Sequence, residues 1–119
     1  HALLTRAPRP SAIFAANDSM AIGLLSAARE LGLAIPNDLA VVGFDDITIA
    51  RFLNPPLTTV GVDAYGLGQQ AVKLMLAATD SSAESSVNCV VLPTVLQVRE
   101  SCGAQRVRAG AQAAQRGGH

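Results

Sequence analysis

The chain has 119 residues, 50% of them hydrophobic, which is the size and composition of one globular domain with a packed core. Nine basic and nine acidic residues cancel, so the charge balance argues against a surface built to neutralise nucleic-acid phosphates or anionic lipids. Cys89 and Cys102 stand without a second pair or a histidine cluster, so the sequence suggests neither a disulfide framework nor a zinc site and favours free thiols in a reducing compartment.

A strand followed by a helix is predicted for the first third of the chain. Residues 12–16, AIFAA, form a short apolar run that is typical of a strand buried on both faces. From Ser19 the spacing becomes helical, and Gly32 stands where a left-handed cap would end the helix. The apolar positions that define this helix are Met20, Leu24, Ala28 and Leu31.

The same order of elements returns after position 38. Residues 39–44, LAVVGF, predict a second buried strand, and residues 54–62, NPPLTTVGV, predict a connection stiffened by prolines. Asp63 can cap a second helix that runs to about Thr79. Strands alternating with helices of this length predict an α/β fold with a parallel sheet flanked by helices.

The last part of the chain has weaker signals. After a surface loop, VNCVVLPTVLQVRES predicts two strand-like pieces on either side of Pro93. Residues 104–119 have no apolar periodicity and are expected to form a mobile tail. No apolar run approaches the roughly 20 residues that span a bilayer.

Pairs of polar residues follow both buried strands. In open α/β sheets ligands bind beyond the carboxyl ends of strands, where Asn17-Asp18 and Asp45-Asp46 are expected. Carboxylates accept hydrogen bonds from adjacent hydroxyls and an amide both donates and accepts, which suits a polyhydroxylated molecule or an amine. Capping and turn formation explain either pair equally well. We expect Asp18 or Ser19 to start the helix and Asn17 to face the crevice beside Asp45.

Other chemistries fit the sequence poorly. Acidic pairs at strand ends can hold magnesium for phosphotransfer, but Lys73 is the only lysine and no glycine-rich phosphate loop follows either strand. The two histidines are the terminal residues, His1 and His119, and no G-x-S-x-G motif is present. The sequence therefore predicts neither an enzyme activity nor a cofactor.

Taken in order, the motifs resemble the LacI/GalR family of bacterial transcriptional repressors. The resemblance covers residues 10–103 and is carried by ND at 17–18, the G-x-x-x-P loop at 32–36, GFDD at 43–46, PPLTT at 55–59 and VRES at 98–101. It implies part of a two-lobed type I periplasmic-binding-protein fold. Residues 1–61 and 92–103 would belong to the C-terminal lobe and residues 62–91 to the first lobe, most of which is absent.

The resemblance also implies a function. A small, sugar-like effector would bind between the lobes against Asn17 and Asp45, with Asp18 nearby, and would control operator binding by a helix-turn-helix head that this chain lacks. An arginine that also contacts the effector would lie upstream. The alternative is an extracytoplasmic sugar-binding protein of the same fold, and a carboxylate-using enzyme is a third, weaker hypothesis. A repressor would be cytoplasmic and would have no membrane partner.

Two kinds of association follow from the resemblance. Family members form homodimers, which makes Ile22, Leu25, Ile49 and Phe52 candidate interface residues, although core positions explain them equally well. The helix at 63–79 and the strand at 87–91 would expose an apolar face that the missing lobe normally covers. The isolated chain is therefore expected to pair with another copy or to pack this segment differently.

Overall fold

The computed structural model describes residues 1–79 and 89–104. Its elements are α1 (Ala2–Thr5), β1 (Ala12–Phe14), α2 (Asp18–Glu30), β2 (Ala40–Asp45), the 3-10 helix η1 (Thr48–Phe52), β3 (Thr58–Val62), α3 (Ala64–Thr79) and β4 (Thr94–Gln97). The chain divides into two compact units, one made of His1–Gly61 and the segment from Leu96 onward, the other of Val62–Val95.

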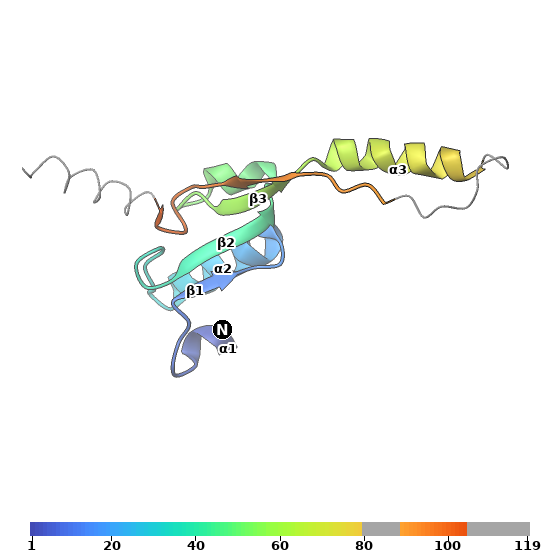
Figure 1. Cartoon of the computed structure of the whole chain (residues 1–119). Coiled ribbons are helices and arrows are strands. Elements are labelled where there is room, and N and C mark those ends of the chain that lie inside the picture. Colours follow the sequence, from blue (N-terminus) through green and yellow to red (C-terminus); the bar gives the residue numbers. More distant parts are fainter. Residues whose placement is uncertain (80–88, 105–119) are drawn as a thin grey trace, which may run out of the picture. The chain divides into compact units, whose positions relative to one another are not determined.

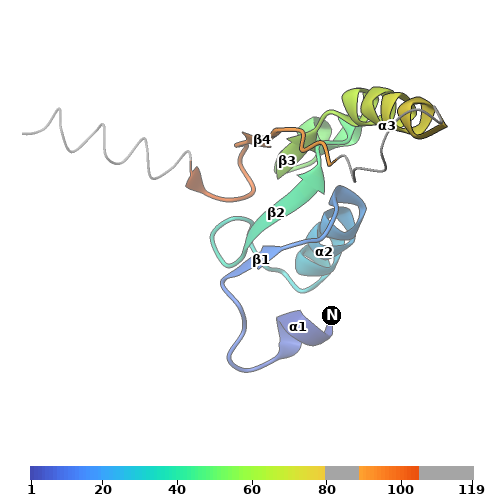
Figure 2. The same ribbon diagram turned by 45° about the vertical axis from the view of Figure 1, so that its right-hand side comes forward.

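The strands form one sheet in the order β1-β2-β3-β4 (Figure 1). β1 and β2 run parallel with Phe14 opposite Val42, and β2 and β3 run parallel with Val42 opposite Thr58. Helix α2 packs against β2 on one face of the sheet, as the two ribbon views show (Figures 1 and 2). These parallel pairs confirm the predicted α/β class.

Helix α2 begins and ends where the sequence predicts. At its C-terminus Gly32 has a φ of +69°, a left-handed conformation that glycine adopts without steric penalty. The Gly32 N–H donates to the Arg29 carbonyl at 3.0 Å, and the Leu33 N–H donates to the Ala28 carbonyl at 2.9 Å. These bonds satisfy carbonyls that the end of a helix would otherwise leave unpaired.

The core lies between α2 and the sheet. Ala21 and Ala28 on α2 and Val41 on β2 are fully buried, and the short alanine side chains let the helix approach the strand closely. Leu39 and Leu57, both 0% exposed, are the largest side chains of this core. Burying a leucine side chain contributes about 1.5–3 kcal/mol, so these two contribute much of its apolar stabilisation.

Two details of the sheet differ from the sequence prediction. The segment expected to be a connection contains β3, whose first residues Thr58 and Thr59 are buried. The strand was not predicted because its buried part begins with two polar residues. Strand β1 is not buried on both faces, since Phe14 is 62% exposed. An apolar run indicates that both faces of a strand can be buried, but it does not indicate that the residues packing on those faces belong to this chain.

Helix α3 belongs to the second compact unit. Asp63 accepts a hydrogen bond from the Gly66 N–H at 2.8 Å, which confirms the predicted cap. No residue of α3 is buried, and Tyr65, Met75 and Leu76 are 78%, 62% and 63% exposed. This exposure agrees with the apolar face expected for the segment.

The remaining predictions concern the chain after α3. Residues 89–93 have no regular structure, so the strand expected before Pro93 is absent from its described part, and residues 87–88 lie outside the described residues. The expected tail lies outside them too, from residue 105 onward. Cys89 and Cys102 are free thiols, as expected. In the described ranges, 1–79 and 89–104, no helix is long and apolar enough to cross a bilayer.

Candidate functional site

The strand register brings the two predicted polar pairs to one edge of the sheet. Phe14 lies opposite Val42 in the parallel pairing of β1 and β2. Asn17 and Asp45 each stand three residues beyond these partners, so both lie at the carboxyl ends of neighbouring parallel strands, Asp45 as the last residue of β2. This edge is where ligands bind in open α/β sheets, and we call Asn17 and Asp45 the rim pair.

Asn17 is the N-cap of α2. Its backbone is extended, with φ −152° and ψ 169°, and its side-chain Oδ1 accepts a hydrogen bond from the Met20 N–H at 2.8 Å. The helix therefore starts at Asp18, as expected, but its cap is Asn17, which was expected only to face the crevice. The cap uses only the amide oxygen of the half-buried Asn17, so the two amide hydrogens can still donate to a ligand.

Asp18 lies beneath the rim and has no exposed surface. Its Oδ1 accepts a hydrogen bond from the Thr59 hydroxyl at 2.6 Å, and its Oδ2 accepts one from the Ile47 N–H at 2.9 Å. Both carboxylate oxygens thus accept hydrogen bonds from other residues of the protein, and Asp18 presents no atom to a ligand in this structure. Of the three residues predicted to bind a ligand, only Asn17 and Asp45 have exposed surface.

Asp45 and Asp46 have unusual backbone conformations. Their φ values are +111° and +53°, in the region that L side chains rarely adopt. Residues held this way cost about 1–3 kcal/mol each and concentrate at functional sites. The Asp45 side chain is exposed, whereas that of Asp46 is 18% exposed and pairs with Arg99. The turn therefore presents one carboxylate outward and anchors the next.

Arg99 anchors this turn from the far end of the chain. Its guanidinium donates to Asp46 Oδ1 at 2.6 Å and to the Leu57 carbonyl at 2.8 Å. Its backbone N–H donates to the Thr58 hydroxyl at 2.8 Å. A bonded pair with both side chains less than a fifth exposed is better shielded from water than a surface pair, so it holds the turn more firmly.

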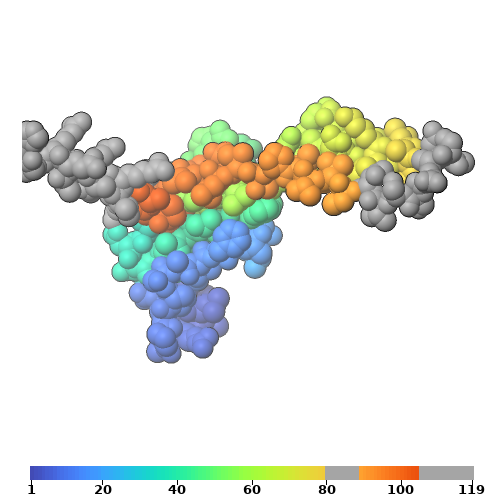
Figure 3. Space-filling view, viewed as in Figure 1, coloured from blue at the N-terminus to red at the C-terminus, as the bar shows by residue number. Residues whose placement is uncertain are grey.

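Ser101 joins the same segment to two strands. Its hydroxyl donates to the Val41 carbonyl at 2.6 Å and accepts from the Thr58 N–H at 2.8 Å, and its carbonyl accepts from the Val41 N–H at 2.9 Å. Figure 3 shows residues 96–104, orange to red, lying against the teal and green residues of β2 and β3. Residues 98–101, VRES, therefore connect β2 and β3 through Ser101 and hold the turn that carries Asp45 through Arg99.

The rim pair can recognise but has little means to catalyse. A carboxylate accepts hydrogen bonds from adjacent hydroxyls, and the Asn17 amide can donate to an oxygen of the same molecule. Within the described parts of the chain, no group of three or more His, Cys, Asp or Glu side chains is placed to hold a metal ion. The arrangement suits a neutral, polyhydroxylated ligand.

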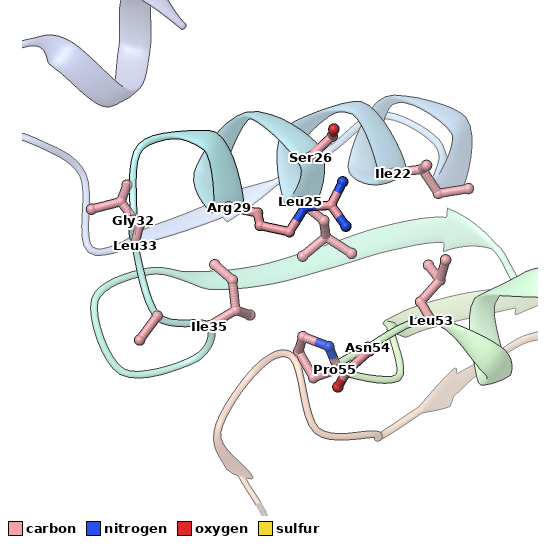
Figure 4. A pocket seen from close by; sticks show the side chains of 11 residues that line it. Ile22, Leu25, Ser26, Arg29, Gly32, Leu33, Ile35, Leu53, Asn54 and Pro55 are labelled. Carbon is pink, nitrogen blue, oxygen red and sulfur yellow. The ribbon is translucent and has the colours of Figure 1, made fainter.

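A groove of about 630 Å³ lies away from the rim, between α2 and the segment after η1. Figure 4 shows Ile22 and Leu25 on α2 facing Leu53 and Pro55. The candidate interface residues Ile22 and Leu25 are half-buried and line this groove, whose lining also includes the polar residues Ser26, Arg29 and Asn54. Ile49 and Phe52 on η1 are 49% and 71% exposed, which places neither of them in the core.

Comparison with known proteins gives one consistent family. A model of the periplasmic binding protein-like domain matches residues 1–102. The ribose operon repressor of Haemophilus influenzae is 40% identical over 99 residues, which are 83% of this chain and 30% of that protein. The chain thus spans less than a third of the length of this curated relative.

Two solved structures carry a sugar. A transcriptional regulator CelR–cellobiose complex matches with a TM-score of 0.75 and 39% identity over 82% of this chain and 30% of that one. A LacI family transcriptional regulator from Enterococcus faecium with bound ribose matches with a TM-score of 0.67 and 33% identity over 76% of this chain and 34% of that one. The names of all three proteins are those of repressors or regulators, and none is an enzyme name.

Proposed function

The chain belongs to the periplasmic-binding-protein-like domain family and within it to the LacI family of transcriptional regulators, and we propose that it is the effector-binding and dimerisation region of a bacterial repressor. A small, sugar-like effector lies between two lobes and controls operator binding by a helix-turn-helix head outside this chain. Ligand closes the lobes and shifts the population of dimers that bind DNA. The repressor acts in the cytoplasm.

The observation that carries this proposal is the geometry of Asp45. An exposed carboxylate with a φ of +111° stands at the carboxyl end of a parallel strand, where glycine would fit the backbone more easily. A strained residue at such a position supports a role in binding. Asp45 accepts hydrogen bonds from two effector hydroxyls, and the amide of Asn17 donates to a third oxygen.

Ribose and cellobiose in the two related structures support the chemical class of the effector. Both are neutral molecules with adjacent hydroxyl groups, which is the chemistry that one carboxylate and one amide recognise. The rim pair provides half of such a site. The other contacts, including a positively charged one, come from the lobe that precedes this chain.

The division into compact units supports the assignment of the two lobes. One unit ends at Gly61 and resumes at Leu96, close to the proposed crossing points after residue 61 and before residue 92. We assign residues 1–61 and 92–103 to the C-terminal lobe and residues 62–91 to the first lobe. The exposed side chains of α3 then pack inside that first lobe, and the association expected of the isolated chain stays a prediction.

The proposal is tested by screening sugars against the whole protein that contains this chain, beginning with ribose and cellobiose. A sugar present at 100 times its dissociation constant stabilises the folded protein by about 2.7 kcal/mol, which raises the melting temperature by several degrees. A raised melting temperature together with a changed operator affinity supports a repressor. Stabilisation without any effect on operator DNA supports a transport protein of the same fold, and no stabilisation by any sugar contradicts both.

The groove beside α2 and the exposed side chains of η1 support the proposal that the protein forms a homodimer. A homodimer interface is self-complementary, so a protruding residue on one copy needs an apolar depression on the other. Phe52, 71% exposed, provides the protrusion, and Ile22 and Leu25 line a depression on the same unit. We propose that Phe52 and Ile49 pack against α2 of a second copy.

Replacement of Phe52 by glutamate is expected to convert the dimeric whole protein to monomers at micromolar concentration. A charge that must be desolvated in an apolar contact costs several kcal/mol, and every 1.4 kcal/mol weakens the dimer about tenfold. Light scattering measures the change, with Met20→Glu as the matched control because Met20 is 59% exposed on α2 but does not line the groove. An unchanged dimer in Phe52→Glu contradicts this interface.

A further inference from the structure

Asp18 is a fully buried carboxylate that joins the two halves of the rim pair. It directly follows Asn17 in the chain, and its Oδ2 accepts the N–H of Ile47, two residues beyond Asp45. We propose that Asp18 is a positioning residue for the effector, acting by fixing the turn that presents Asp45 relative to Asn17. This inference rests on the proposed function, because it concerns the same site.

The hydrogen bond to Ile47 restrains a backbone that is otherwise unfavourable. Asp45 and Asp46 both have positive φ values, and Ile47 is the first residue after them. A carboxylate that accepts a backbone N–H forms a strong, charge-assisted bond, which is strengthened further where water is excluded. The bond therefore holds the downstream end of the strained turn, next to the helix start that carries Asn17.

Thr59 provides a second connection from Asp18 to the same turn. Thr59 Oγ1 donates to Asp18 Oδ1 at 2.6 Å and accepts a hydrogen bond from the Asp46 N–H at 3.4 Å. Asp18, Thr59 and the turn thus form a closed set of contacts beneath the rim. Asp18 does not itself reach the crevice, so it affects ligand binding by fixing the position of Asp45 relative to Asn17.

Space for this carboxylate comes from the absence of a side chain at Gly43. Gly43 pairs with Thr59 in the β2–β3 register. A Cβ added at Gly43 would overlap Asp18 Oδ1 and lie 3.2 Å from Leu57 Cδ2. The buried Asp18 carboxylate therefore occupies the space that a side chain at position 43 would fill. Arg99 bonds to Asp46, and Asp18 bonds to Ile47, so both residues that follow Asp45 are held by side-chain contacts.

The test compares Asp18→Asn, Thr59→Val and Thr59→Ser in the whole protein. Two readouts are needed: hydrogen exchange of the Ile47 and Asp46 amides, and the dissociation constant of ribose or cellobiose, whichever binds the unchanged protein. Thr59→Val is expected to speed exchange at Asp46 and Ile47 at least tenfold and to weaken sugar binding about tenfold, and Asp18→Asn to do the same. Thr59→Ser keeps the hydroxyl and is expected to leave both the exchange rates and the sugar dissociation constant unchanged.

Two controls separate positioning from general stability. Asp38→Asn alters a carboxylate that accepts a backbone N–H, that of Ala34 at 2.8 Å, in a turn on another part of the unit. Ala28→Gly weakens buried α2 without touching the rim. Both are expected to leave sugar affinity unchanged, whatever they do to the melting temperature.

The outcomes distinguish this inference from the proposed function. Sugar binding by the unchanged protein with equal affinity in Thr59→Val and Asp18→Asn overturns the inference and leaves the proposed function standing. Faster exchange at the turn without weaker binding also overturns it, because Asp18 is then only structural. Absence of sugar binding by the unchanged protein contradicts the proposed function, and with it any positioning role toward such an effector.

Discussion

In the whole protein, Asp45→Ala abolishes the response of operator binding to the effector and leaves operator binding without effector intact. Asp45 is exposed at the rim, and its carboxylate is assigned hydrogen bonds from two effector hydroxyls. A hydrogen bond to a charged group contributes about 1.5–3 kcal/mol, so their combined loss weakens effector binding by roughly a hundredfold or more. Fluorescence anisotropy of labelled operator DNA, with and without the sugar, measures both quantities.

A second substitution at the same position separates binding from folding. Glycine suits the φ of +111° better than alanine, so Asp45→Gly is expected to be at least as stable as Asp45→Ala while losing the same response. Asp38→Ala removes an acidic side chain of an exposed turn residue and serves as the control for charge. A full effector response in both Asp45 variants means that the rim carboxylate does not bind the effector.

Gly43→Ala is expected to be the most destabilising single-methyl change in the sheet. The added Cβ would overlap the Asp18 carboxylate, which is fully buried and bonded through both oxygens, and would also press on Leu57. Overpacking costs about 1–3 kcal/mol, and displacing a buried, bonded acid costs about 1–3 kcal/mol more. Urea denaturation should therefore show a loss of roughly 2–6 kcal/mol in the free energy of unfolding.

The matched control is Gly23→Ala on α2. A Cβ at Gly23 would meet nothing within 4 Å, and the position is exposed inside a helix. Alanine stabilises such positions by about 0.5–1 kcal/mol. If Gly43→Ala is tolerated as well as Gly23→Ala, the carboxylate is not confined beneath the rim and its positioning role loses its structural basis.

The parts of the fold that follow from local patterns were predictable from the sequence. Apolar runs and helical spacing located β1, α2, β2 and α3, because each of these buries or presents apolar side chains at a regular period. Strand β3 was missed, since Thr58 and Thr59 look like surface residues in the sequence. Their burial depends on Ser101 and Asp18, partners 41 to 43 positions away, which no local pattern shows.

The candidate site was predicted in part for the same reason. The strand ends pointed to Asn17 and Asp45, because parallel strands place their carboxyl ends at one edge. The roles within the first pair were predicted only in part: the helix starts at Asp18 as expected, but Asn17 is its cap and Asp18 lies buried below it. Either residue is a good N-cap by type, so only the tertiary partner of Asp18, the Ile47 N–H, decides between them. Arg99 carried no local signal of its function.

A crystal structure of the whole protein with the sugar found in the screen tests the assigned contacts themselves. The expected result is a sugar between the two lobes, with Asp45 carboxylate oxygens about 2.5–3.0 Å from two hydroxyl oxygens and the Asn17 amide nitrogen about 2.7–3.2 Å from a third oxygen. Asp18 should remain bonded to Ile47 and Thr59 beneath them. A sugar bound without contact to Asn17 or Asp45 contradicts the assignment of this rim as the effector site.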